Sequence, residues 1–322
     1  MKNKSNDIII CMACDDNYAP HAAALIASIA ENKNEEDHLR FFILSDNLSG
    51  AVQQKFHEMA KMWNFPLTFL DCKDDTFKEL PTWRGKYNAY FRFAIHRLLP
   101  GSISKALYLD CDMIATTSLA PLFNTDISGR YAAVVAEAKD STFTTHNSFY
   151  FNSGMMLFNI DKFREDDLER KAIELGIRRF SEIEFPDQDI LNELFAGKVI
   201  FLPLPWNTIL FPAYYHRSVK LSGKPLAFSV DELKAAISDP GIIHFAGFRP
   251  WRALCEHPLR HFYWKYARMT PFYCETVKNY RISWMSELYR RYFRIRLSKK
   301  NVHLKLFGVD IISWKSVGKK AI

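Results

Sequence analysis

The amino-acid sequence predicts an α/β fold with a mostly parallel sheet. Short runs of β-branched and apolar residues alternate with segments of helical spacing, as in βαβ units joined by right-handed crossovers. With 322 residues, the chain is long enough for one large domain with an appendage, and it shows no internal repeat. Its composition, 48% apolar and 25% charged, excludes collagen-like and wholly disordered chains.

The first part of the chain follows this alternation element by element. Residues 8–13 form a continuous apolar run, a polar turn follows at 15–18, and Pro20 opens a helical segment over 21–30. The next predicted elements are a strand over 41–44, a helix over 49–62, a strand over 67–70, a helix over 88–99 and a strand over 106–109. Further on, strands over 131–136 and 149–160 precede helices over 161–180 and 187–195.

The positive charge is concentrated at the C-terminus. The whole chain carries +7 and has a pI near 9.0. Between 278 and 320 there are 12 Lys and Arg against two acidic residues, so this stretch carries +10 and residues 1–277 carry −3. We therefore predict a domain over 1–277 and a basic, helical tail over 278–322.

The spacing of apolar and basic residues in the tail predicts an amphipathic helix over 281–297. Its apolar face would consist of Ile282, Met285, Leu288, Tyr289, Tyr292 and Phe293, opposite Arg290, Arg291 and Arg294. Such a helix suits an anionic membrane surface, and the alternative is that it caps the domain core. A non-enzymatic membrane- or nucleic-acid-binding protein is disfavoured, because the −3 domain shows no recognised nucleic-acid motif.

The cysteines and the apolar runs indicate a cytoplasmic protein. Six cysteines scattered through a long chain do not suit a disulfide framework. Cys11 and Cys14 have redox-motif spacing but belong to the first apolar run, which favours a buried strand. That run is too short and too closely flanked by acids for a secretion signal, and the uncharged stretches 141–160 and 199–216 are too polar or too proline-rich to span a bilayer.

Two acidic side chains follow the strand over 106–109. Asp110 and Asp112 are one residue apart, so in an extended chain both project to the same side, about 7 Å apart. Ligands of open α/β sheets bind beyond the carboxyl ends of strands, where this pair lies. Carboxylate oxygens suit Mg²⁺ or Mn²⁺, and an added imidazole favours Mn²⁺. The alternative is a chance Asp-x-Asp turn.

Six motifs occur in order between residues 8 and 252. They are ACDDNY at 13–18, YFRF at 90–93, LYLDCD at 107–112, FNSG at 151–154, DQD at 187–189 and HFAGFRPW at 244–251. Together they closely resemble glycosyltransferase family 8, retaining enzymes that include bacterial lipooligosaccharide galactosyltransferases and glycogenin. The resemblance implies a single Rossmann-like, nucleotide-sugar-binding domain of GT-A type with a mixed, mostly parallel sheet, and it does not cover the tail.

The resemblance implies a metal and a donor site. Asp110, Asp112 and His244 would bind Mn²⁺, or alternatively Mg²⁺, with coordination positions open for the diphosphate of a UDP-sugar. The other residues expected to meet the donor are Asp15, Asn17, Tyr18, Arg92, Cys111, Asn152, Ser153, Gly154, Gly247 and Arg249. The alternatives are a structural core histidine at 244, a helix-initiating turn at 15–17 and a surface arginine at 92.

The last motif departs from the family pattern. Family members often carry Lys-Pro-Trp there, with the lysine reaching the β-phosphate. Here Arg249 replaces the lysine, and its spacing from Gly247 is one residue shorter. The guanidinium fork also suits phosphate, so we expect the contact with an altered loop geometry.

The resemblance also implies the reaction. Asp187 would accept a hydrogen bond from a sugar hydroxyl, with Gln188 on the opposite face of the ring, although both also suit a helix start after Pro186. The expected chemistry is transfer of galactose or glucose from a UDP-hexose to a hydroxyl of a lipid-linked lipopolysaccharide or lipooligosaccharide core, giving an α-linkage. Because Gln188 is a poor nucleophile, same-face internal return is favoured, and Asp189 is the candidate nucleophile of a double displacement. A glycogenin-like enzyme that glucosylates a protein or itself is the alternative.

Overall fold

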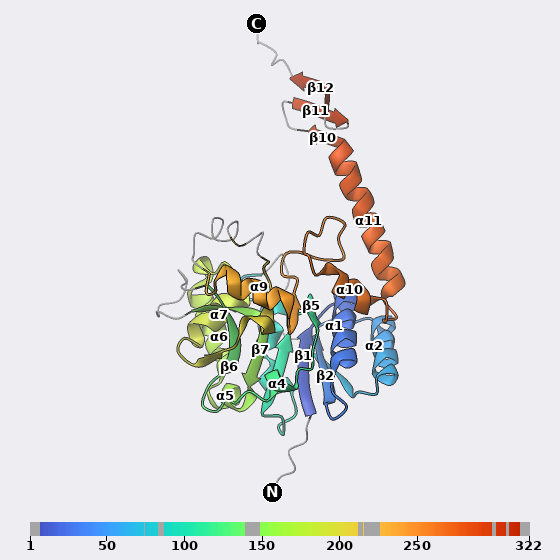
Figure 1. Ribbon diagram of the computed structural model, residues 1–322. Coiled ribbons are helices and arrows are strands. Elements are labelled where there is room, and N and C mark those ends of the chain that lie inside the picture. The colour runs from blue at the N-terminus through green and yellow to red at the C-terminus, as the bar shows by residue number, and fades with distance from the viewer. Residues whose placement is uncertain are drawn as a thin grey trace.

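A computed structural model describes residues 7–73, 75–82, 87–138, 149–211, 215, 226–297, 301–306 and 309–315, with side chains as far as residue 285. Its centre is a seven-stranded sheet (Figure 1). In order across the sheet, the strands are β3 (Leu67–Asp71), β2 (His38–Ser45), β1 (Asp7–Ala13), β4 (Lys105–Leu109), β7 (Tyr150–Asn159), β6 (Ala132–Ala138) and β8 (Val199–Phe201).

The strand directions confirm a mixed, mostly parallel sheet. Strands β1 to β4 are parallel, β7 is antiparallel to β4 and β6, and β8 is parallel to β6. Cys11 pairs with Tyr108, so the polar segments after β1 and β4 leave the sheet side by side. Leu109 lies opposite Met155, and the antiparallel direction brings the residues before Met155 to the same edge.

Helices cover both faces of the sheet. Ile8, Ile10 and Met12 of β1 enter one core, whereas Ile9 and Cys11 enter the other, as strand alternation requires. The first core is closed by α1 (Ala19–Asn32), α2 (Gly50–Met62) and α10 (Arg260–Ala267). The second is closed by η1 (Asn88–Phe93), α3 (Ile95–Leu98), α5 (Ile160–Glu165), α6 (Leu168–Arg178) and α7 (Pro186–Leu194).

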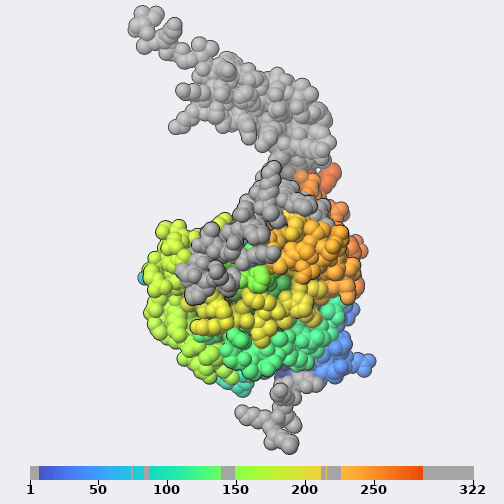
Figure 2. Space-filling model, turned by 60° about the vertical axis from the view of Figure 1, so that its left-hand side comes forward, coloured from blue at the N-terminus to red at the C-terminus, as the bar shows by residue number. Residues whose placement is uncertain are grey.

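A two-stranded antiparallel pair joins distant parts of the chain. Strand β5 (Met113–Ala115) pairs with β9 (Ile242–His244), and Met113 lies opposite His244. Thr208, directly after η3 (Leu204–Asn207), bridges β9 on its other side. In Figure 2 the orange C-terminal part of the domain lies beside the yellow segment that contains η3. The remaining short helices are α4 (Ala120–Phe123), η2 (Phe180–Glu182) and α9 (Val230–Ser238).

Two predicted helices have a different form. The segment predicted over 88–99 is the 3₁₀ helix η1 followed by the short α3. In the tighter helix, residues three apart are aligned, and Tyr90 and Phe93 stack with ring centroids 5.8 Å apart. The helix predicted over 161–180 is divided at Asp167, whose left-handed φ of 49° precedes α6.

The tail is helical only in part. Helix α11 (Tyr273–Tyr292) begins before residue 278, and β10 (Phe293–Leu297), β11 (Asn301–Leu306) and β12 (Val309–Lys315) form an antiparallel sheet. The helix predicted over 281–297 is therefore wrong beyond Tyr292, because residues 293–297 alternate apolar and arginine with the period of a strand. The predicted apolar face from Leu288 onward lies outside the described side chains. Within the described chain, no helix has the length and apolarity to cross a membrane.

Candidate active site

A cavity of about 520 Å³ lies where β1 and β4 end, beside the start of α7. Its lining includes eleven of the residues predicted from the sequence: Asp15, Asn17, Tyr18, Arg92, Asp110, Cys111, Asp112, Ser153, Asp187, Gln188 and Arg249. Two further predicted residues contact this lining: Asn152 is hydrogen-bonded to Gln188, and His244 is paired with Asp112. The fold therefore gathers residues from both ends of the domain at the edge of the sheet where ligands bind.

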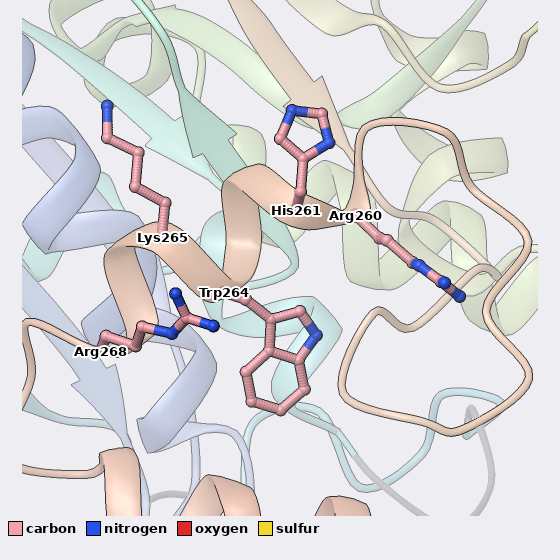
Figure 3. A pocket seen from close by; sticks show the side chains of 5 residues that line it. All are labelled: Arg260, His261, Trp264, Lys265 and Arg268. Carbon is pink, nitrogen blue, oxygen red and sulfur yellow. The ribbon is translucent and has the colours of Figure 1, made fainter.

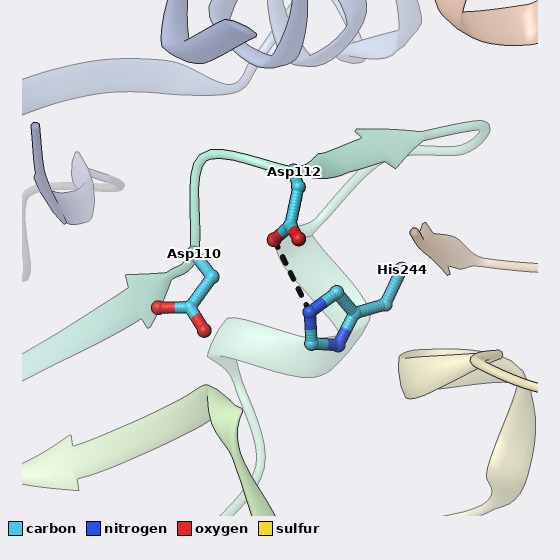
Figure 4. Close-up of side chains that lie close together, drawn as sticks. All are labelled: Asp110, Asp112 and His244. Carbon is cyan, nitrogen blue, oxygen red and sulfur yellow. Dashed lines mark ion pairs between the residues drawn. The ribbon is translucent and has the colours of Figure 1, made fainter. Parts of the chain in front are cut away.

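Asp110, Asp112 and His244 form a triad at one end of the cavity. One ligand atom from each lies within 4.8 Å of the others, and His244 Nε2 is 3.3 Å from Asp112 Oδ1 (Figure 4). Asp110 follows β4 and Asp112 precedes β5. His244 is the last residue of β9, so the pairing of β5 with β9 sets its position.

The residues around the triad fit a divalent cation. Two carboxylates and an imidazole are a donor set for Mn²⁺ or Mg²⁺ that leaves coordination positions open. A Cβ on Gly154 would lie 2.5 Å from His244 Cε1 and 2.8 Å from Asp110 Oδ2. Glycine is thus required where β7 passes the triad, because a side chain there would displace two of its three members.

Mutual attraction favours the charged forms of His244 and Asp112. Burial is the largest single effect on the pKa of His244 and lowers it, but the attraction and hydrogen bond of Asp112, with Asp110, more than offset burial, and the net pKa is raised. Burial likewise opposes the charge on Asp112, and His244 lowers its pKa overall. A cation between them would replace the His244 proton as the partner of the carboxylates.

Arg92 is buried, so the surface alternative is wrong. Its side chain is 4% exposed and donates to Asp110 at 2.9 Å and Asp187 at 3.0 Å. It also donates to the Ser153 carbonyl oxygen, and its guanidinium lies 4.3 Å from the ring centroid of Tyr108. The Arg92 guanidinium therefore balances the negative charge of two carboxylates, one directly after β4 and one in α7.

Asp187 and Gln188 begin α7 after Pro186, so the helix-start interpretation and the cavity-lining interpretation both hold. Asp187 Oδ2 accepts from Ser153 Oγ at 2.8 Å as well as from Arg92. Burial raises the pKa of Asp187 despite Arg92. Gln188 Oε1 accepts from the Ser153 backbone N–H at 3.0 Å, which fixes the orientation of its amide.

The structure does not bring Asp189 into the cavity lining among the described residues. Its carboxylate accepts from the Tyr150 hydroxyl at 2.6 Å and from the backbone N–H groups of Glu184 and Phe185 at 2.9 Å. These bonds hold the chain that leads into α7. Asp189 therefore stabilises the chain before α7, whereas Asp187 lines the cavity.

The β1 end of the cavity is formed by Asp15, Asn17, Tyr18 and Arg249. Asp15 Oδ1 accepts from the Tyr18 backbone N–H at 3.0 Å, so the predicted helix-initiating turn is present alongside the cavity-lining role. Tyr18 is 38% exposed, and its ring meets Trp251 edge-on at 6.2 Å. A partly exposed aromatic ring in a cavity lining suits stacking of a planar base.

The shortened last motif carries backbone strain. Gly247 has φ of 80°, which glycine adopts readily, but Arg249 has φ of 38°, which is unfavourable for a side chain with a Cβ. Arg249 nevertheless lines the cavity. The missing residue is thus accommodated by a left-handed turn that keeps the guanidinium at the site.

Sequence reasoning missed Asn207. This residue is 1% exposed at the end of η3, and its Oδ1 lies 2.9 Å from His244 Nδ1. It belongs to none of the six motifs, and the sequence signal is weak: a polar residue that closes an apolar, proline-containing run at 201–206. His21 was also missed; it stacks on Trp251 with centroids 3.6 Å apart.

Comparison with known proteins places this site in a family. The sequence model described as "Glycosyl transferase family 8" matches residues 9–255. General stress protein A of Bacillus subtilis (strain 168) is 25% identical over 280 residues, covering 83% of this chain and 96% of that protein. The lipopolysaccharide 1,2-glucosyltransferase of Escherichia coli (strain K12) is 26% identical over 272 residues, covering 81% of this chain and 78% of that protein.

Among solved structures, the galactosyltransferase LgtC in complex with donor and acceptor sugar analogues superposes with a TM-score of 0.68 at 22% identity. The match covers 82% of this chain and 96% of that one, and it confirms the predicted GT-A type of fold. The family match takes in all six ordered motifs and the cavity they line. The chain therefore belongs to glycosyl transferase family 8.

Proposed function

We propose that the protein transfers a hexose from a UDP-hexose to a hydroxyl of a lipopolysaccharide or lipooligosaccharide core, with retention and hence an α-linkage. The observation that carries the proposal is the Asp110, Asp112 and His244 triad, which opens into a cavity lined by the family's motifs. We propose Mn²⁺ as its ion, with Mg²⁺ as the alternative, because the imidazole favours the softer cation. When bound, the ion neutralises charge on the departing diphosphate.

The two ends of the cavity divide the recognition of the donor. At the β1 end, Tyr18 would stack on the uracil and Asp15 would accept from its ring N–H. Arg249 would contact the diphosphate through its guanidinium fork. Near α7, Asp187 Oδ2 is bonded to Arg92 and Ser153, so its other oxygen is the proposed acceptor for a sugar hydroxyl.

The mechanism proposed for retention rests on the residue expected on the far face of the sugar. Gln188, which lines the cavity, is expected there and is a poor nucleophile, while Asp189 is outside the lining and bonded to Tyr150. We therefore propose internal return. The bond from the anomeric carbon to the β-phosphate oxygen breaks, the acceptor oxygen bonds to that carbon on the same face, and the acceptor proton passes to the released phosphate oxygen.

The acceptor class rests on the relatives. The E. coli relative is named as a lipopolysaccharide glucosyltransferase and LgtC as a galactosyltransferase, which supports a hexose donor without selecting between glucose and galactose. The two sugars differ in one hydroxyl orientation. We propose a lipid-linked oligosaccharide as the acceptor, presented at the inner face of the cytoplasmic membrane.

A basic surface next to the tail supports docking at a membrane. The hollow on α10 is lined by Arg260, His261, Trp264, Lys265 and Arg268, which project from the helix in Figure 3. Residues 249–322 contain 17 Lys and Arg against four acidic residues. On α11, Ile282 and Met285 are 54% and 66% exposed. The cationic side chains of α10 and the exposed apolar side chains of α11 suit anionic lipids.

Membrane docking predicts a salt-sensitive association that charge reversal on α10 weakens. The triple variant Arg260→Glu, Lys265→Glu and Arg268→Glu should lose most co-sedimentation with vesicles containing anionic lipid, since each basic residue contributes about 1 kcal/mol at such a surface. Its UDP release should be unchanged. The matched control reverses Arg170, Lys171 and Arg178 on α6; equal losses in both variants would refute a specific docking face.

The proposed reaction is tested by UDP release across a panel of UDP-sugars, with and without Mn²⁺, on the wild type and on Asp112→Ala. We expect turnover with UDP-glucose or UDP-galactose that requires the metal and is lost in Asp112→Ala, while the exposed control Asp161→Asn is unaffected. Metal-independent turnover or an active Asp112→Ala would contradict the proposal. Hexose added to the protein itself, seen by intact mass, would instead indicate a glycogenin-like enzyme.

A further inference from the structure

Four buried or partly buried side chains form a continuous hydrogen-bonded chain behind the cavity. They are Gln188 of α7, Asn152 of β7, Asn207 of η3 and His244 of β9. The chain joins the wall of the cavity to the triad through four separate elements. Because amide groups have a donor side and an acceptor side, the direction of every bond in such a chain matters.

Backbone groups determine the direction at Asn152. The Gly154 N–H lies 3.0 Å from one end of the Asn152 amide, and since a backbone N–H only donates, that end is Oδ1. Asn207 meets the same oxygen at 3.1 Å and must therefore present its Nδ2. The other end of the Asn207 amide, facing His244 Nδ1 at 2.9 Å, is then Oδ1.

This direction selects the tautomer of His244. An acceptor opposite Nδ1 requires that Nδ1 carry the proton in the neutral ring. The lone pair of the neutral imidazole is then on Nε2, the nitrogen that faces Asp112 at 3.3 Å within the triad. The ring is thus prepared to bind a cation through Nε2 without a change of tautomer.

The same chain fixes Gln188 in the opposite sense. Its Oε1 accepts from Asn152 Nδ2 and from the Ser153 N–H, each at 3.0 Å. Its amide N–H₂ donates to the Tyr150 hydroxyl, although burial and the neighbouring Asp189 raise the pKa of that tyrosine overall. The carbonyl oxygen of Gln188 is therefore occupied and is not available to attack a sugar.

We propose that Asn207 is a positioning residue: by accepting from His244 Nδ1 and donating to Asn152, it sets the metal-binding tautomer of His244 and the orientation of Gln188 together. The inference rests on the proposed metal site. Outer hydrogen bonds to a metal-binding histidine orient the ring and contribute 10- to 100-fold in metal affinity. One amide here supports both the proposed metal ligand and, through Asn152, the Gln188 side chain in the cavity wall.

The test compares Asn207→Ala, Asn207→Asp and the control Asn192→Ala. Asn192 is 2% exposed and bonds the Phe151 backbone and the Gln188 carbonyl oxygen, but it does not reach His244. Mn²⁺ is titrated against each protein with UDP, and free Mn²⁺ is followed by electron paramagnetic resonance. Asn207→Ala should bind Mn²⁺ roughly 10- to 100-fold more weakly, while Asn192→Ala should match the wild type.

Asn207→Asp separates the two roles. Its carboxylate still accepts from His244 Nδ1, so Mn²⁺ affinity should recover to near the wild-type value. It no longer donates to Asn152, so kcat should fall while the KM for UDP-sugar stays close to normal. Mn²⁺ affinity in Asn207→Asp as poor as in Asn207→Ala would overturn the proposed acceptor role.

A measurement on the metal-free protein tests the tautomer of His244 without relying on the proposed reaction. In ¹⁵N-histidine spectra at alkaline pH, His244 should carry its proton on Nδ1 in the wild type and lose that preference in Asn207→Ala. A wild-type proton on Nε2 would overturn the inference. If the wild type has the Nδ1 proton but binds no Mn²⁺, the proposed function fails and the hydrogen-bonded chain stands.

Discussion

The triad end and the β1 end of the cavity are built on different principles. At the triad end, His244 and Arg92 are 3% and 4% exposed at the side chain and are held by partners from several elements. At the β1 end, Tyr18 is 38% exposed and Arg249 lies on a strained turn. The charged side chains of the triad end are therefore held in place before any ligand binds, whereas the proposed nucleoside contacts lie on more exposed segments.

The largest expected effect is the loss of Arg92. In Arg92→Leu, Asp187 and Asp110 would lose their shared cation in a buried setting, which costs about 3–5 kcal/mol of unfolding free energy. Urea unfolding of the protein without metal or nucleotide measures this cost. Arg170→Leu on α6 is the control, because Arg170 has two ion pairs on an exposed surface and should unfold near the wild type. Equal midpoints for both variants would show that the buried ion pairs of the triad end stabilise the fold no more than exposed ion pairs do.

A smaller effect is expected from pH at the β1 end. Burial lowers the pKa of His21 to about 3, against the attraction of Asp112 and Asp15, while Arg249 adds to the decrease. In the unfolded chain, the His21 ring therefore takes up a proton below about pH 6.5, whereas in the native protein it does so only near pH 3. Stability from the neutral ring is complete above pH 6.5 and is lost as the pH falls, by about 1.4 kcal/mol per unit.

His21→Phe isolates this term, because phenylalanine can keep the stack on Trp251 without titrating. Denaturant unfolding of both proteins at several pH values should give a shallower acid slope for the variant between about pH 6 and 4. His257, whose pKa burial lowers to about 4, supplies a residual slope in both. Parallel curves for the two proteins would show that His21 is not held neutral.

The smallest stability effect is expected at Arg249. Arg249→Gly relieves a left-handed φ that costs about 1 kcal/mol, and this gain offsets the greater freedom of glycine in the unfolded chain. The unfolding free energy should therefore stay within about 1 kcal/mol of the wild type, while the KM for UDP-sugar rises because the phosphate contact is lost. Arg249→Asn, which tolerates the same φ, is the matched control for backbone relief. A normal KM in both variants would show that the cavity does not use the guanidinium.

The sequence predicted six of the seven strands of the sheet, because their period and burial are local properties, but it did not predict the three-residue β8. Asp110 and Asp112 were identified by their spacing at a strand end, and the motif order supplied their partner His244. The tail shows the opposite case. The helical spacing that ends at Phe293 overlaps the two-residue alternation of residues 293–297. Over so short a run, the helical and strand periods cannot be told apart from the sequence.

What the sequence by itself determined was the alternation of elements, the excess of basic residues towards the C-terminus and the residue types of the site. Tertiary structure alone decided that Arg92 is buried between two carboxylates, that Asp189 accepts a hydrogen bond from Tyr150 outside the cavity lining, and that Asn207 contacts His244 Nδ1. Local pattern reports which side chains a segment buries, but not which partner from a distant segment meets them. Here Asn207 meets His244 because the neighbouring Thr208 bridges β9, whose partner β5 lies more than a hundred residues earlier in the chain.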